Sequence, residues 1–543
     1  MKRTNNNIYK SSRLYRLLFM TGVILTGASA CTKNFERYNT DNTGVNTNLT
    51  SLMTHEQMAV INFSGGGDPN SYQLQQNLNA DCFSGYMMSA NAFGGNTNLN
   101  YFMMTSWNGE PFKVVYLDVL SYVSKLQGMG VDKDYPAVFA VAQIVKIMAM
   151  GRATDIYGPL PYSQAGTAKS GVAYDSQQAI YNSFFTELDA ATAALRSWIS
   201  SGQKLPFEFA PMDLVYNGDF NRWLQFANSL RLRLAMHIVK IDPTTARAQA
   251  EKALNPAEGG VITDNDGIMK VKVSGAGFSN PLVFIAMNWT DINIGASIQS
   301  YMSGYNDPRI GRYMDKSTDA SFPVQYKGIR IGSTVNKPAY QTYSTLNFKD
   351  GSSPSFTLTT PVQLMTAAEV YFLRAEAALR GWSNTAGSAQ SLYEQGINTS
   401  LAQWGVTDAA YINNNTAKPA GYTDPKNAAN NAAAPSDITI QWSEAATNEQ
   451  KLERIMTQKW IAMFPEGQEA WTEFRRTGYP KLFTVVNNNS GGTIDTDIQV
   501  RRLPYPQNEY NTNRTELNKG IQLLGGLDNG GTRLWWDVNK GNF

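Results

Sequence analysis

Apolar residues that recur every three or four positions constrain the fold of this chain more than any other feature of its sequence. One such run starts at Trp223 and ends before Asp242 and Pro243. Its apolar members are Trp223, Phe226, Ala227, Leu230, Leu234 and Ile238. This spacing puts the side chains on one face of an α-helix, whereas the alternation typical of strands is scarce in the chain. We therefore predict an all-α, mainly helical fold.

A second apolar stripe is followed directly by another amphipathic segment. The stripe consists of Leu364, Ala368, Tyr371, Ala375 and Ala378. Glu376 and Arg380 are spaced for an i,i+4 pair on its outer side, and Gly381 ends it. Because residues 389–404 are amphipathic again, we expect an antiparallel helical hairpin that resembles a tetratricopeptide-type unit.

Further helical patterns extend this hairpin into a scaffold of helix pairs. They cover residues 140–152, 177–198, 223–241, 245–254 and 450–464. The predicted tetratricopeptide-like scaffold includes about 140–254, 364–404 and 450–480. Core packing is the expected role of each apolar stripe.

Three long segments between the helical patterns lack a helical period. They are residues 65–108, 264–356 and 413–437. Loops of this length are either functional or disordered. The first two are rich in aromatic residues and are candidates for a ligand-facing half, whereas the third has almost no large apolar residue and is expected to be a surface excursion. Since no linker-like break separates these segments, we predict one large body.

The first 30 residues have the pattern of a signal peptide. Five basic residues and no acidic residue precede and flank the apolar run 17–25. This run is shorter than the roughly 20 residues that a membrane-spanning helix needs, and no later apolar stretch is expected to reach that length. We therefore predict an exported mature chain, residues 31–543, that begins with a polar tether over residues 31–48 and does not span the membrane.

Cys31 directly follows the small residues Ala28, Ser29 and Ala30. A cysteine at this place resembles a lipobox, in which the cysteine is acylated after cleavage. However, Ala28 stands where lipoboxes usually have leucine, and the same small residues fit ordinary signal-peptide cleavage. Two alternatives follow: lipidation of Cys31 with Cys82 as a lone thiol, or a disulfide between them in a soluble periplasmic protein.

Charge and residue types exclude several function classes. Loss of the leader would change the formal net charge from +2 to about −3, so no basic excess remains for nucleic acid. The chain contains only His55 and His237, and no nucleophile elbow, P-loop or complete dinucleotide fingerprint. His237 falls within a helical pattern and is expected to be structural. Asp264 begins a short acidic cluster that fits a turn better than a calcium loop. We therefore predict no cofactor, no metal site and no catalytic residue.

Five segments, in the same order along the chain, resemble the SusD/RagB family, particularly its SusD-like lipoprotein branch. They are residues 153–165 (ATDIYGPLPYSQA), 223–235 (WLQFANSLRLRLA), 306–309 (NDPR), 366–377 (TAAEVYFLRAEA) and 501–506 (RRLPYP). The resemblance implies four tetratricopeptide-like helix pairs that support an irregular, loop-rich half, with a lipid anchor at the outer membrane and exposure at the cell surface. The matched motifs themselves are expected to be scaffold.

The resemblance also implies a function. Members of the family are non-catalytic capture proteins that act as lids on a SusC-like TonB-dependent transporter and bind glycans or, in the RagB-like branch, peptides. We expect oligosaccharide binding, with peptide binding as the alternative. A secreted glycoside hydrolase and a purely structural role are the rival classes, because the distance between two carboxylates is not readable from sequence.

Ligand residues of this family lie in variable loops, so none transfers by motif. Aromatic rings are the best candidates because the C–H face of a sugar stacks on them. The candidates in the two aromatic-rich segments are Tyr86, Phe93, Tyr101, Trp107, Trp289, Tyr301 and Tyr340.

Overall fold

The computed structural model describes residues 49–60, 69–166, 171–273, 279–348 and 354–543. Within residues 52–543, which form one unit, four pairs of consecutive helices pack together. The pairs are α10 (Pro136–Tyr157) with α11 (Gln177–Ser201), α12 (Phe220–His237) with α13 (Pro243–Leu254), α18 (Ala367–Leu379) with α19 (Ala389–Gln403), and α20 (Asn448–Met463) with α21 (Gly467–Thr477). Neighbouring pairs also pack through α11 on α12 and α18 on α20. The prediction of a mainly helical fold is confirmed.

The shorter elements precede, separate and follow these pairs along the chain. The α-helices are α2 (Leu49–Ala59), α4 (Pro69–Tyr72), α5 (Ala80–Phe83), α6 (Thr105–Asn108), α7 (Glu110–Val114), α8 (Ser121–Gly128), α9 (Val131–Asp134), α14 (Pro281–Phe284), α15 (Ala296–Gly304), α16 (Ile310–Tyr313), α17 (Lys337–Tyr340), α22 (Gln507–Thr512) and α23 (Arg514–Leu524). Turns of π-helix are η1 (Gln73–Asn77), η3 (Val115–Leu120) and η7 (Ile285–Trp289), and 3-10 turns are η2 (Asn98–Asn100), η4 (Ala210–Met212), η5 (Pro256–Glu258), η6 (Asn265–Gly267), η8 (Tyr411–Asn413) and η9 (Ala428–Asn430).

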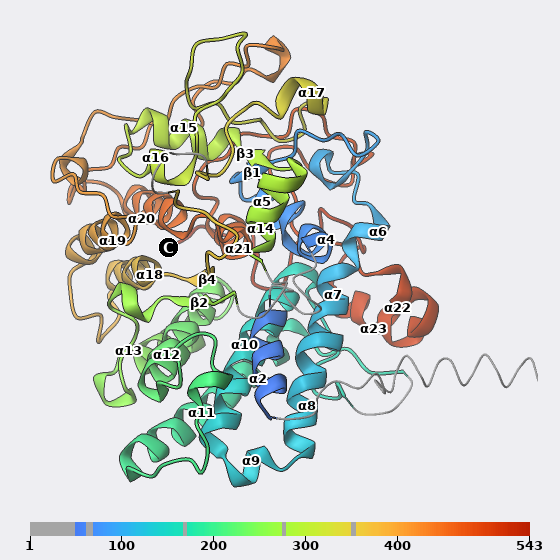
Figure 1. Cartoon of the computed structure of the whole chain (residues 1–543), viewed down its shortest axis with the longest axis vertical. Coiled ribbons are helices and arrows are strands. Elements are labelled where there is room, and N and C mark those ends of the chain that lie inside the picture. Colours follow the sequence, from blue (N-terminus) through green and yellow to red (C-terminus); the bar gives the residue numbers. More distant parts are fainter. Residues whose placement is uncertain (1–48, 61–68, 167–170, 274–278, 349–353) are drawn as a thin grey trace, which may run out of the picture. The chain divides into compact units, whose positions relative to one another are not determined.

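The described strands form two small antiparallel ladders. β1 (Met87–Met88) pairs with β3 (Asn293–Ile294), and β2 (Met269–Val271) pairs with β4 (Val362–Met365). In Figure 1 the pairs α10–α11 and α12–α13 fill the lower part of the view, while α15, α16 and α17 lie among long connections in the upper part. Regular helix pairs therefore support a loop-rich region.

Side-chain caps set the start of several helices. Thr366 accepts a hydrogen bond from the backbone N–H of Glu369 at 3.0 Å, which begins α18. The predicted stripe started at Leu364, but this residue lies in β4, where the backbone pairs with β2. The helix therefore starts after the cap, and Leu364 belongs to the ladder.

The segments that resemble the SusD/RagB motifs supply buried ion pairs. Arg309 binds Asp307 at 2.6 Å, Arg233 binds Glu369 at 2.7 Å, and Arg501 binds Asp537 at 2.7 Å. Buried charges must be paired, so substitutions at these positions would leave an uncompensated charge. This accords with a scaffold role for the motifs.

The predicted outer-surface position of the Glu376–Arg380 pair is wrong. The pair forms, at 2.8 Å, but the Glu376 side chain is fully buried because Arg476 of α21 binds it from the other side. Helix α18 is therefore covered on both faces, which its own apolar stripe did not indicate.

The expectation that no apolar stretch after the leader reaches the length of a membrane-spanning helix is wrong, because α10 does. Its 22 residues are, in the described part of the chain, long and apolar enough to cross a membrane by length and composition, with a mean hydropathy of 1.3 in the most apolar window. However, 78% of that window is buried inside the protein. A helix that is apolar all round suits the centre of a core, and α10 packs against α8, α11 and α12.

Candidate ligand-binding site

Three of the seven predicted aromatic residues lie in the protein interior. Tyr86 stacks on Trp460 of α20, with ring centroids 5.3 Å apart, and Tyr301 meets the same indole edge-on. Tyr101 is 1% exposed and packs against Phe83. Burial raises the pKa of all three hydroxyls. These rings pack the core and present no open face to a ligand in this structure.

Tyr340 is also buried, but in a polar setting. Its hydroxyl donates to Asp424 at 3.0 Å, and the hydroxyl of Tyr343 donates to the same carboxylate at 2.6 Å. Asn430 donates to Asp424 as well. Tyr340 therefore anchors the connection around residues 424–430.

Phe93 and Trp107 form an edge-to-face pair. Their ring centroids are 5.4 Å apart and their planes are nearly perpendicular. Trp107 lies on α6 and is buried, whereas Phe93 is half-buried in the preceding connection with a left-handed φ of 45°. The buried indole therefore supports a phenyl ring that remains accessible.

Trp289 is the second accessible ring. It ends the π-helical turn η7, which continues α14, and its ring packs edge-on against Phe284 at 5.7 Å. Thr290 follows in the left-handed region with a φ of 52°, so the chain turns away directly after the indole. The ring is half-buried. Trp289 therefore has a fixed position and an exposed part.

Polar side chains connect the segments that carry these rings. Asn91 donates to the Asp291 carboxylate at 3.2 Å, and Lys337 donates both to that carboxylate and to the Trp289 carbonyl at 2.6 Å. The β1–β3 ladder begins next to both segments. We call Asn91, Phe93, Trp107, Trp289, Asp291 and Lys337 the aromatic surface.

The aromatic surface combines ring faces with hydrogen-bonding groups. A sugar could place its C–H face on a ring while its hydroxyl groups bond to the amide, carboxylate and ammonium groups nearby. The sequence predicted the rings Phe93, Trp107 and Trp289 but missed the three polar residues. The feature that brings these polar residues together is the pairing of β1 with β3, two strands that are distant in the sequence and only two residues long.

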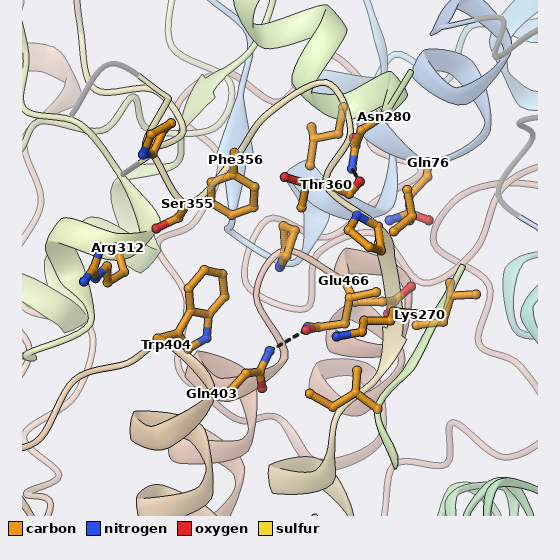
Figure 2. Close-up of a pocket in the computed structure, with 18 of the residues that line it drawn as sticks. Gln76, Lys270, Asn280, Arg312, Ser355, Phe356, Thr360, Gln403, Trp404 and Glu466 are labelled. Atoms are coloured by element: carbon orange, nitrogen blue, oxygen red, sulfur yellow. Dashed lines mark hydrogen bonds between the residues drawn. The ribbon is translucent and has the colours of Figure 1, made fainter. Parts of the chain in front are cut away.

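A cavity of about 550 Å³ lies between the β2–β4 ladder, α14, the end of α19 and the turn before α21. Figure 2 shows Phe356 and Trp404 on its wall, together with Lys270, Arg312 and Gln403. Gln403 donates a hydrogen bond to Gln363, which also lines the cavity. None of the aromatic residues predicted from sequence lines it. The predicted segment 264–356 nevertheless contains several of its lining residues.

Among the described His, Cys and acidic residues, one buried group, made of His237, Glu469 and Glu473, brings its ligand atoms close enough together to hold a metal ion. His237 Nε2 lies 3.0 Å from Glu469 and 3.9 Å from Glu473. The Lys459 ammonium lies 3.2 Å from Glu473 and 3.7 Å from Glu469, so a side chain already supplies the cation. His237 is 1% exposed in α12, which confirms the prediction of a structural histidine.

Two other predictions concern single residues. Asp264 accepts the backbone N–H of Gly267 at 3.0 Å and binds Arg222 at 2.9 Å, which confirms the predicted turn. Cys82 is a buried free thiol that donates to the Asn77 carbonyl at 3.2 Å, as the lone-thiol alternative requires. Cys31, the leader over residues 1–30 and the tether over residues 31–48 lie outside the described residues.

Comparison with known proteins gives consistent matches over the whole fold. A sequence model of the family described as "SusD-like: Susd and RagB outer membrane lipoprotein" matches residues 30–537. Among solved structures, a chitin-binding SusD homolog from Flavobacterium johnsoniae is 42% identical with a TM-score of 0.86, and covers 91% of this chain and 100% of its own. No sequence among curated proteins matches.

Two further structures are similarly close. A SusD homolog from Bacteroides vulgatus is 38% identical with a TM-score of 0.83, and covers 91% of this chain and 98% of its own. A SusD homolog from Bacteroides uniformis is 36% identical with a TM-score of 0.83, and covers 90% and 99%. The helix pairs and the loop-rich region described above are therefore shared with several solved structures.

Proposed function

The chain belongs to the SusD-like family of outer membrane lipoproteins, and from this premise we propose that it captures oligosaccharides on the aromatic surface without cleaving them. The observation that carries the proposal is the joining of two accessible rings, Phe93 and Trp289, by the Asn91–Asp291–Lys337 hydrogen bonds. The binding of chitin by the 42% identical homolog supports a glycan as the ligand.

The carboxylates at the two candidate sites support binding rather than catalysis. Most glycoside hydrolases need two carboxylates on either side of the bond that breaks. The aromatic surface has Asp291 alone, and this group is bound by Lys337. Among the described residues that line the cavity, only Glu466 has a carboxylate, and Arg152 binds it. Neither site therefore provides a free acid–base pair.

We further propose that the captured glycan passes to a SusC-like TonB-dependent transporter, on which the protein acts as a lid at the cell surface. Membership of the SusD-like family supports this step, because the resemblance to that family implies a transporter partner. The energy for uptake would come through the transporter.

Calorimetric titration with chito-oligosaccharides, followed by an assay for new reducing ends, tests capture without cleavage. We expect heat of binding and no new reducing ends. Cleavage above background would show a hydrolase, and binding of peptides in place of glycans would favour the RagB-like alternative. Mass spectrometry of the protein purified from native membranes tests the lid role, because a TonB-dependent barrel should co-purify with it.

A further inference from the structure

Two cationic side chains line the cavity without a counter-ion. Lys270 is exposed on β2 and Arg312 is half-buried on α16, and within the described parts of the chain neither side chain has a hydrogen bond or ion pair. Glu466 is bound by Arg152 and accepts the backbone N–H of Glu469 at 2.7 Å. The described lining of the cavity therefore has an uncompensated positive charge, which favours an anionic ligand.

The two cations do not form a single anion-binding nest. In the view of Figure 2, Arg312 lies on the left and Lys270 on the right, with Trp404 drawn between them. The two helix starts at the cavity are already capped by side chains, α21 by Glu466 and α14 by Asn280. A compact phosphate prefers several free backbone N–H groups at one point, so separate carboxylates fit this arrangement better.

The wall of the cavity also includes the aromatic rings of Trp404 and Phe356. Trp404 is half-buried and is held by Tyr313 and Phe356, with ring centroids 4.7 Å and 5.7 Å away. Its position is therefore fixed before a ligand arrives. A pyranose ring can stack its C–H face on such an indole, and a volume of about 550 Å³ is within the usual range for small-ligand sites.

Hydrogen bonds also hold two glutamines that line the cavity, Gln363 and Gln403. Gln363 donates to the carbonyls of Met463 and Phe464, both at 3.3 Å, which orients its amide. The oxygen of that amide accepts a hydrogen bond from Gln403 at 2.6 Å. These glutamines are bound to each other and to the backbone, which leaves Lys270 and Arg312 as the free charged groups.

We propose that the cavity is a second ligand site, for a saccharide that carries carboxylate groups, in which Lys270 and Arg312 each bind one carboxylate and Trp404 stacks on the sugar ring. This site is separate from the aromatic surface, because the two share no residue. The proposal therefore does not depend on neutral-glycan capture at Phe93 and Trp289.

Calorimetric titration with digalacturonate tests the proposal in the full mature chain. We expect binding to the wild type and a loss of about ten- to a hundredfold in affinity for Lys270→Met and for Arg312→Met, since each removes one charged hydrogen bond. Lys272→Met is the matched control, because it removes an equal charge just past β2 without lining the cavity. It should bind digalacturonate as the wild type does.

Two further ligands and one further variant complete the test. The dimethyl ester of digalacturonate should not bind, and a glutamyl-glutamate dipeptide should bind less well than the sugar. The proposal is overturned by absent digalacturonate binding, by equal binding of the ester, by preference for the dipeptide, or by an equal loss in Lys272→Met. Trp289→Ala should keep full digalacturonate binding, which separates a failure here from a failure at the aromatic surface. Lys270 is exposed, so its variant carries the test even if Arg312→Met does not fold.

Discussion

Arg476 and Glu376 join α21 to α18 through two parallel hydrogen bonds of 2.8 Å and 2.7 Å, and both side chains are completely buried. Burial alone would raise the pKa of Glu376, but Arg476 and Arg380 lower it to about 2. The carboxylate therefore remains charged at neutral pH. The pair connects two neighbouring helix pairs through charge as well as apolar packing.

Replacement of Arg476 by Met should lower the free energy of unfolding by about 3–5 kcal/mol, because it leaves buried carboxylates without their main partner. Urea unfolding would measure the change. Arg247→Met is the control, since Arg247 binds Glu251 on an exposed face, and its effect should stay below about 1 kcal/mol. Equal effects in both variants would contradict a special role for the buried pair.

His237 should make stability depend on pH in the alkaline range. Burial alone would lower the pKa of His237, but Glu469 and Asp155 raise it to about 9. Tyr181 also faces the ring at 3.0 Å, and Glu473 lies 3.9 Å away. The folded-state pKa is above the unfolded value of about 6.5, so this stabilisation is complete below that pH and is lost as the pH rises through about 9.

Unfolding of the wild type and of His237→Gln, measured from pH 6 to pH 10, would isolate this contribution. The stability difference between the two proteins should shrink by about 2–3 kcal/mol over the range. A difference that stays constant with pH would show that the histidine is neutral in the folded protein.

Cys31→Ser should release the protein from the membrane fraction, because under the lipoprotein hypothesis the lipid on an acylated Cys31 holds it there. Detergent partition of cell extracts would measure the release. Cys82→Ser serves as the control, since Cys82 is a buried thiol and should not affect partition. Retention of the Cys31 variant with the membrane would argue against lipidation at this residue.

Trp289→Ala should weaken chito-oligosaccharide binding by about 1–3 kcal/mol, by analogy with the stacking of bases on aromatic rings. The melting temperature should change little, because a half-buried ring leaves a smaller cavity than a core ring. Trp198→Ala, which removes a half-buried indole on α11, should leave affinity unchanged. A large drop in melting temperature without loss of affinity would assign Trp289 to the core.

Local patterns in the sequence were sufficient for the long helices of the pairs, but not for shorter helices such as α15 (Ala296–Gly304) and not for the site. The stripe from Trp223 to Ile238 predicts α12 because its spacing follows directly from helix geometry. By contrast, Tyr86 and Tyr301 lie in segments that looked like ligand loops, and both pack on Trp460. Such packing joins residues 374 positions apart in the case of Tyr86, which no local period indicates.

Local sequence patterns also failed to predict which charged residues are buried. Glu376 and Arg380 have the spacing of an exposed pair, and nothing near them in the sequence indicates that Arg476 covers the other side. The polar residues Asn91 and Asp291 were missed for a similar reason, since their meeting depends on the β1–β3 ladder. Long-range contacts therefore decide which polar and aromatic residues are accessible.

Asn91 and Asp291 are 200 positions apart in the sequence. The segment that carries Asn91 and Phe93 forms one wall of the aromatic surface, and the segment that carries Trp289 and Asp291 forms the other. The two walls are therefore encoded separately, and the two-residue strands β1 and β3 hold them together. A substitution or insertion near Phe93 would alter one wall and leave Trp289 in place. Under the proposed function, the sugar preference of this fold can therefore change by exchange of one loop at a time, with half of the aromatic surface retained at each step.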